Sequence, residues 1–89
     1  MKVDFKQLDV RNLDGEPLVD LHKSAANLIY RHTTDLGLVN VAEKIYTGEA
    51  VELDKSEVRG IMTLLVNPQH GLFAFVRKAF QEYLTSLLQ

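Results

Sequence analysis

Residues 67–88 read NPQHGLFAFVRKAFQEYLTSLL and carry the most informative pattern of the chain. Asn67 and Pro68 are typical of a helix N-cap and a first helical residue, because proline lacks the N–H group that is unsatisfied there. Apolar residues then recur at alternating spacings of three and four, which places them on one broad helix face. Such a face is the core of a small domain, a docking surface for another chain, or both. Its members are Leu72, Phe73, Val76, Ala79, Phe80, Tyr83, Leu84, Leu87 and Leu88.

The composition is that of one ordinary globular domain. The chain has 89 residues, of which 46% are hydrophobic and 25% are charged, so we expect neither disorder nor a second domain. The net charge is −2 and the basic residues are scattered, with Arg77-Lys78 as the densest pair, which disfavours a nucleic-acid binder. The chain has no cysteine, no apolar leader and no apolar run of membrane-spanning length. We therefore expect a soluble, cytoplasmic protein.

The N-terminal residues have a different pattern from the rest of the chain. Between Val3 and Val10, apolar residues nearly alternate with polar ones, and the phase slips once, as it does at a β-bulge. Asp14-Gly15 is typical of a turn, and residues 18–21 have the character of a returning strand. We predict a β-hairpin over residues 3–21, which must lie on the helices because an isolated hairpin is marginally stable.

Four amphipathic segments follow this N-terminal region. Their periodicity predicts helices over residues 21–33, 36–47, 55–66 and 68–88. Between the second and third helices, residues 50–53 alternate charged and apolar side chains, which suits a third short strand. The last two helices flank a proline, so they are either two separate helices or one bent helix.

Capping residues mark the ends of these helices. Asp35 is a natural N-cap for the second helix, and Gly48 ends that helix in a left-handed conformation. Asp54 and Glu57 have the spacing of a capping box. The predicted fold class is α+β, with the hairpin packed on four α-helices in a single small domain. The predicted core consists of Phe5, Leu8, Leu21, Leu28, Ile29, Val41, Ile45, Ile61, Leu65, Phe73, Val76, Phe80 and Leu84.

No set of residues has the pattern of a catalytic or cofactor site. His22, His32 and His70 lack the spacing that would place two metal ligands on one helix face, and His32 is expected to be half-buried. The serines, glycines and carboxylates match no nucleophile motif, phosphate loop or ion-binding loop. Tyr30 and Tyr46 are expected to pack over the helix junction. We expect no enzyme, no metal and no cofactor.

Several short motifs follow one another in a definite order. They are Leu28-Ile29-Tyr30, Asp35-Leu36-Gly37, Ala42-Glu43-Lys44-Ile45-Tyr46 and Gly48-Glu49-Ala50-Val51-Glu52-Leu53, then an acidic-capped helix and a closing helix with Phe75-Val76. Over most of the chain this order resembles small proteins of unknown function that bacterial prophages and mobile elements encode, some of them among virion-assembly genes. The resemblance implies a short cytoplasmic adaptor or assembly factor and no catalytic residue. Residues 67–71 are not part of that pattern.

The leading functional hypothesis is a non-enzymatic module that binds a protein partner or a second copy of itself. The alternative is a small transcriptional regulator that reads DNA with the last two helices, although the final helix presents aromatic and leucine side chains. Membranes and small-molecule substrates are not expected as partners. So small a domain cannot easily bury the whole apolar face of the last helix, so either a homodimer or the hairpin covers its edge. The candidate interface residues are Leu72, Phe75, Ala79, Tyr83, Leu87 and Leu88.

Overall fold

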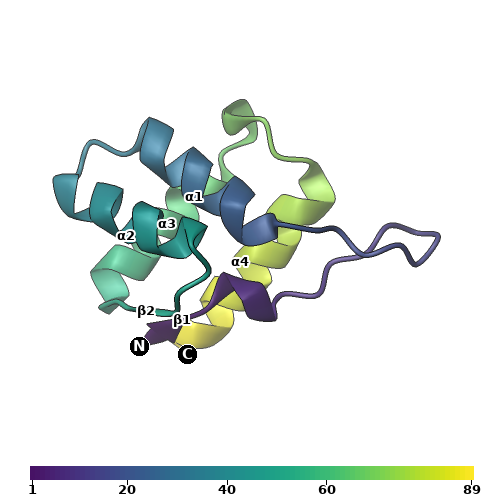
Figure 1. The fold of residues 1–89 in the computed structure, drawn as a ribbon, viewed down its shortest axis with the longest axis horizontal. Helices are drawn as coiled ribbons and strands as arrows, with labels where there is room; N and C mark the ends of the chain where they lie inside the picture. The colour runs from purple at the N-terminus through teal and green to yellow at the C-terminus, as the bar shows by residue number, and fades with distance from the viewer.

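Four α-helices form most of the structure, a computed structural model that describes residues 1–89 (Figure 1). The predicted α+β class with four helices is confirmed. The helices are α1 (Leu21–His32), α2 (Leu36–Tyr46), α3 (Lys55–Val66) and α4 (Ala74–Leu88). The other elements are the strands β1 (Lys2–Val3) and β2 (Val51–Glu52) and the 3-10 turns η1 (Phe5–Gln7) and η2 (Pro68–His70).

The sheet joins the N-terminal strand to a strand from the middle of the chain. β1 and β2 are antiparallel, with Lys2 opposite Glu52 and Val3 opposite Val51. The short strand that the sequence predicts at residues 50–53 is therefore the direct partner of β1. Val3 and Val51 are both buried, so this pairing fastens the N-terminal segment to the core.

Residues 3–21 do not form one continuous hairpin, and Asp4 provides the reason. Its side chain accepts a hydrogen bond from the Lys6 N–H group at 3.0 Å and caps η1, so the extended chain ends after two residues. The alternation of apolar and polar residues slips at this 3-10 turn, and not at a β-bulge as the sequence suggests. A reduced hairpin remains further along, where Arg11 and Pro17 form an isolated antiparallel bridge.

The predicted caps of the helices are present. Asp35 accepts a hydrogen bond from the Gly37 N–H group at 2.7 Å. Asp54 and Glu57 form a complete capping box, in which each carboxylate accepts a hydrogen bond from the other residue's backbone, at 2.7 and 3.1 Å. Gly48 follows the end of α2 with φ of 89°, a conformation that a side chain would strain.

The last helix begins at Ala74, not at the predicted Pro68. Pro68 instead opens η2, and the Asn67 side chain caps that turn by accepting a backbone hydrogen bond at 2.9 Å. Gly71 then takes φ of 89°, which interrupts the helical path. Asn67 and Pro68 thus have their predicted cap and first-residue roles, but in a single 3-10 turn. α3 and α4 are two separate helices rather than one bent helix.

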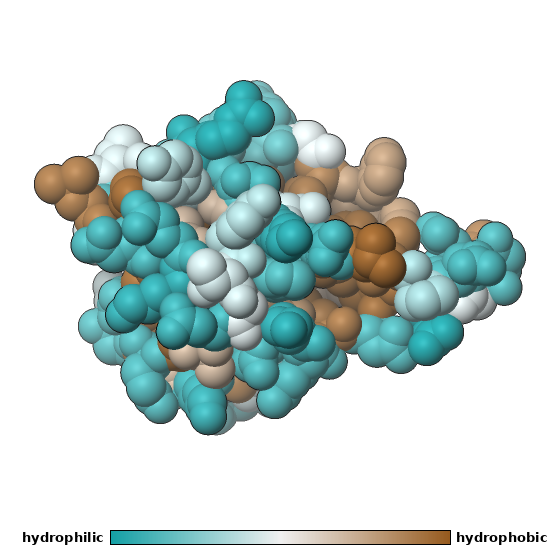
Figure 2. All heavy atoms as spheres, in the orientation of Figure 1, coloured by the Kyte–Doolittle hydropathy of each residue, from teal (hydrophilic) through white to brown (hydrophobic).

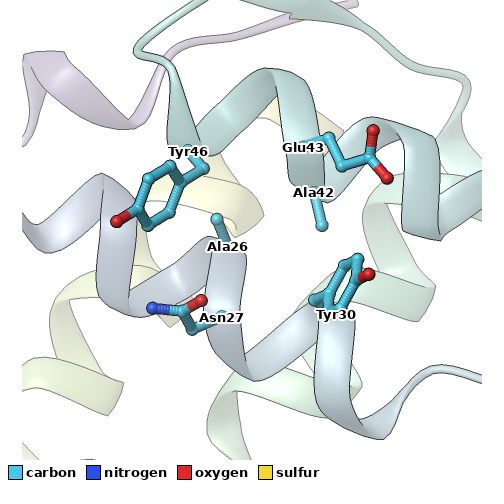
Figure 3. A pocket seen from close by; sticks show the side chains of 6 residues that line it. All are labelled: Ala26, Asn27, Tyr30, Ala42, Glu43 and Tyr46. Atoms are coloured by element: carbon cyan, nitrogen blue, oxygen red, sulfur yellow. The ribbon is translucent and has the colours of Figure 1, made fainter.

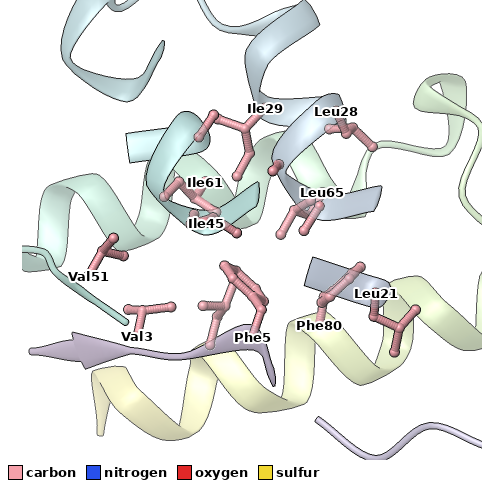
Figure 4. Packing of buried hydrophobic residues seen from close by; sticks show 14 of the residues in the cluster. Val3, Phe5, Leu21, Leu28, Ile29, Ile45, Val51, Ile61, Leu65 and Phe80 are labelled. Carbon is pink, nitrogen blue, oxygen red and sulfur yellow. The ribbon is translucent and has the colours of Figure 1, made fainter. Parts of the chain in front are cut away.

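Phe80 lies fully buried among residues of the N-terminal segment and the other helices (Figure 4). Its ring meets the Phe5 ring edge to face, with the centroids 5.6 Å apart. The hydroxyl of Tyr83, from the next turn of α4, accepts a hydrogen bond from the Asp4 N–H group at 2.8 Å and donates one to the Asp4 carbonyl at 3.2 Å. The N-terminal segment is thereby held against α4 by packing and by hydrogen bonds.

Most of the predicted core is buried, and three predicted members are not. Leu8 and Val41 are half-buried, and Phe73 is 72% exposed. Phe73 precedes the first turn of α4, so its side chain leaves the helix face that carries Val76 and Phe80. Nine further residues are buried but are absent from the predicted core, and most of them are alanines or valines. They are Val3, Val10, Ala25, Ala26, Leu38, Ala42, Val51, Leu53 and Val58.

Candidate protein-interaction surface

A loop between η1 and α1 projects from the helical body (Figure 1). The Leu18 N–H group donates to the Val10 carbonyl at 2.8 Å, and a second backbone bond of 2.9 Å joins the two arms nearer the tip. The tip turns at Gly15, whose φ of 89° suits a residue without a side chain. These bonds give the projecting loop, residues 9–20, a defined shape of its own.

Apolar side chains of the projecting loop lie beside those of the segment that leads into α4. They line two hollows, and the parallel rings of Phe73 and Phe75, with centroids 6.1 Å apart, connect one hollow to the other. Figure 2 shows hydrophobic residues gathered where the projecting loop leaves the body. We define the loop–helix surface as Leu13, Leu18, Val19, Leu72, Phe73 and Phe75.

Four residues of the loop–helix surface are too exposed to belong to the core. Leu13, at the tip of the projecting loop, is fully exposed, and Val19 at its base is 78% exposed. Phe75 is 42% exposed on the first turn of α4, next to the still more exposed Phe73. Large apolar groups that gather on a surface usually mark a binding site, because leaving them in water is unfavourable.

The predicted interface residues are divided between this surface and the core. Leu72 and Phe75 belong to the loop–helix surface. Leu13 and Val19 are missing from the sequence prediction, although a leucine within a turn of otherwise polar residues is a detectable signal. The other predicted interface residues are partly buried against the core along α4: Ala79, Tyr83, Leu87 and Leu88.

Two histidines meet although they lie far apart in the sequence. The rings of His32 and His70 stack with centroids 3.8 Å apart and an interplanar angle of 12°. His32 is exposed rather than half-buried, because it ends α1 beside η2. The Nδ1 atom of His70 lies 2.7 Å from the Leu64 carbonyl, so this nitrogen carries the proton and donates. Desolvation, followed by the charges of His70 and Arg31, lowers the pKa of His32.

The histidine pair has no catalytic or metal-binding neighbours. No group of three or more histidine, aspartate or glutamate side chains is close enough to hold a metal ion. Ser24 lines the same hollow as His32 and His70, and no hydrogen bond joins its hydroxyl to either ring.

The densest basic pair of the chain lies on α4, and both of its side chains have partners within the chain. Lys78 pairs with Glu82 at 4.0 Å on the same helix. Arg77 is half-buried, and its Nη1 atom donates to the Val66 carbonyl at 3.5 Å. The exposed start of α4 carries the aromatic side chains of Phe73 and Phe75 rather than a cluster of free cations.

Comparisons of the chain with models of known protein families, with curated proteins and with solved structures found no match. None of the helices combines the length and the apolar character that a membrane crossing requires. The function of this protein is therefore inferred from the geometry of its own surface.

Proposed function

We propose that this protein is a non-enzymatic protein-interaction module that docks through the loop–helix surface. The observation that supports this function is the joint exposure of Leu13, Val19, Phe73 and Phe75 on neighbouring segments. Covering one such side chain contributes about 1.5–3 kcal/mol, so a partner that covers several of them gains appreciable binding energy.

The first partner that we propose is a second copy of the chain. The alternative explanation of the apolar edge, in which the N-terminal hairpin covers it, loses support because the projecting loop leaves Phe73 and Phe75 exposed. A two-fold dimer covers the same surface on both subunits, and this is the commonest closed symmetry. Leu13, near the tip of the projecting loop, is fully exposed, so a partner subunit can cover it.

The wider role that we propose is that of an adaptor or assembly factor in the bacterial cytoplasm. The resemblance to prophage-encoded proteins supports this role. The lack of cysteine agrees with a reducing compartment, since it leaves the chain without disulfides.

Light scattering over a concentration series tests the self-association. We expect the average mass to rise from one chain toward two as concentration increases, and Phe75→Glu to return it to one chain with the helical circular dichroism unchanged. Leu36→Glu is the matched control, because Leu36 is 83% exposed at the start of α2, outside the loop–helix surface. A single-chain mass at every concentration would contradict the homodimer.

A photo-crosslinking amino acid at position 73 tests the interaction function itself, whichever chain is bound. In cells that express the full chain, we expect discrete adducts from position 73 and none from position 36. Two results together would exclude docking through the loop–helix surface. They are a single-chain mass in light scattering, and crosslinking that gives either the same adducts at positions 73 and 36 or no adducts at all.

A further inference from the structure

A groove between α1 and α2 has a different chemistry from the loop–helix surface (Figure 3). It has a volume of about 410 Å³. Its floor is formed by Ala26 and Ala42, which are almost completely buried, and its walls by Tyr30 and Tyr46. The two alanines let the helices approach closely, while the larger tyrosines leave open space above them.

The two tyrosine rings are available to a ligand. Tyr30 is 52% exposed and Tyr46 is 45% exposed, so neither ring is enclosed by the helix junction over which the sequence predicts them to pack. The only tyrosine hydroxyl that hydrogen-bonds within the chain is that of Tyr83. The groove therefore presents two aromatic rings with free polar ends over an apolar floor.

Glu43 gives the groove a negative rim. It lines the groove from α2 on the same side as Tyr30 in Figure 3, and its carboxylate forms neither an ion pair nor a hydrogen bond with another side chain. Asn27 adds an amide oxygen on the α1 side. An unpaired carboxylate on the rim of a groove that has aromatic walls is complementary to a cation, because the face of an aromatic ring carries negative charge.

We propose that this groove binds an arginine side chain of a partner protein or peptide. The methylene stem of arginine suits the alanine floor, and its planar guanidinium stacks on a tyrosine ring while donating two parallel hydrogen bonds to Glu43. Lysine, with a rounder and more strongly hydrated charge, fits the same groups less well. The inference is independent of the loop–helix surface, since the two sites share no residue.

The chain itself places a cation near one of these rings. The Nζ atom of Lys23 lies 5.4 Å from the centroid of the Tyr46 ring, within the range of a cation–π contact. Lys23 is not among the residues that line the groove, so its ammonium group leaves the space between the two tyrosines open.

NMR titration of the full chain with the peptide Ac-Gly-Arg-Gly-NH2 tests this proposal. The matched probe is the same peptide with citrulline, which keeps the shape of arginine without its charge. We expect saturable shifts of the Ala26 and Ala42 methyl groups and of the Tyr30 and Tyr46 rings, with affinity in the millimolar range for the arginine peptide. The citrulline peptide should bind at least about fivefold more weakly.

Two substitutions locate the binding groups. Glu43→Gln and Tyr30→Leu are each expected to weaken arginine binding about threefold, since each removes one of the two contacts proposed for the guanidinium. Both positions are exposed, so the fold should persist, and the unchanged amide spectrum of the core will show it. Glu16→Gln removes the same charge from the projecting loop and should leave the affinity unchanged.

Four results would overturn the arginine site. These are the absence of saturable shifts at the groove, equal binding of the arginine and citrulline peptides, equal binding of a leucine peptide, and equal weakening by Glu43→Gln and Glu16→Gln. The last would indicate a general charge effect, and equal leucine binding would indicate an unselective apolar groove.

Discussion

Residues 1–8 and residues 9–20 have similar sequence patterns but very different surroundings. The first segment contains Val3 and Phe5, both buried, and it hydrogen-bonds to β2 and to Tyr83, at the far end of the chain. The second segment, the projecting loop, forms its backbone bonds within itself and at the start of α1. Backbone hydrogen bonds to distant partners thus anchor the first segment. The second segment has only Val10 buried and makes only local backbone bonds, so its tip is free to present side chains.

This contrast explains how so small a domain can have both a firm core and an apolar surface. α4 shows it again within a single helix, because Phe80 and Leu84 are fully buried while Phe75 on the first turn is 42% exposed. The buried half of α4 stabilises the fold. Its exposed first turn lies outside the core and is available for binding. Substitutions in the anchored parts should therefore affect stability, and those on the loop–helix surface should affect association.

The largest expected effect is that of Phe80→Ala. It removes a fully buried ring that packs on Phe5, which should cost about 3–5 kcal/mol and unfold much of the protein. Thermal unfolding followed by circular dichroism measures this loss. Phe75→Ala is the matched control on the same helix and should cost less than about 1 kcal/mol. Equal unfolding midpoints for both variants would contradict the distinction between the two halves of α4.

A smaller effect is expected for Tyr83→Phe, which tests how the N-terminal segment is anchored. The change leaves the Asp4 N–H group without its partner, while the Asp4 carbonyl still accepts a hydrogen bond from the Gln7 N–H group at 3.2 Å, and it should cost about 1–2 kcal/mol. Hydrogen exchange of the Asp4 and Val3 amides should also accelerate. Tyr30→Phe removes a hydroxyl that has no partner in the chain and should change neither measurement. If Tyr83→Phe behaves in the same way, the hydroxyl does not anchor this segment.

A pH dependence is expected where α1 meets η2. The pKa of His32 is lowered in the folded protein, so below about pH 6.5 the unfolded chain binds more protons than the folded one. Stability should therefore be complete above this pH and should fall as the pH drops below it. Urea unfolding between pH 5 and 8 measures the change.

Variants of the other two histidines separate the contributions to this pH dependence. His70→Asn removes the ring that stacks on His32, which lessens the desolvation of His32 and removes the charge of His70, so the dependence should flatten. His22→Asn changes a histidine outside the pair and should leave the dependence intact. An unchanged slope in His70→Asn would exclude the stacked pair as its source.

The smallest expected effect is that of Leu13→Ser at the tip of the projecting loop. Leu13 is fully exposed, so the unfolding free energy should stay within about 0.5 kcal/mol of the parent. Association measured by light scattering should weaken, since the same side chain contributes apolar area to the proposed dimer. Val58→Ser, at a fully buried site on α3, is the contrasting variant and should destabilise the fold strongly. A large loss of stability in Leu13→Ser would show that the loop tip is anchored.

Local signals in the sequence suffice for the α+β class, for the four helices and for most of their ends. Asp35, Asp54 and Glu57 cap the helices as predicted, because a cap depends on backbone groups only two or three residues away. The apolar periodicity likewise identifies Phe80, Leu65 and Ile29 as core, since residues on one helix face are buried together.

Only the tertiary structure establishes which distant segments meet. β1 pairs with β2 instead of with its neighbour, His32 stacks on His70, and Tyr30 and Tyr46 line a groove. Such contacts depend on how all the apolar faces can be buried at once, and no local pattern contains that information. Phe73 is a further example, because its spacing matches the core face of α4 although its side chain is exposed. Gly71 ends η2 in a left-handed conformation, and α4 begins only at Ala74, so Phe73 precedes the helix and is not buried by it.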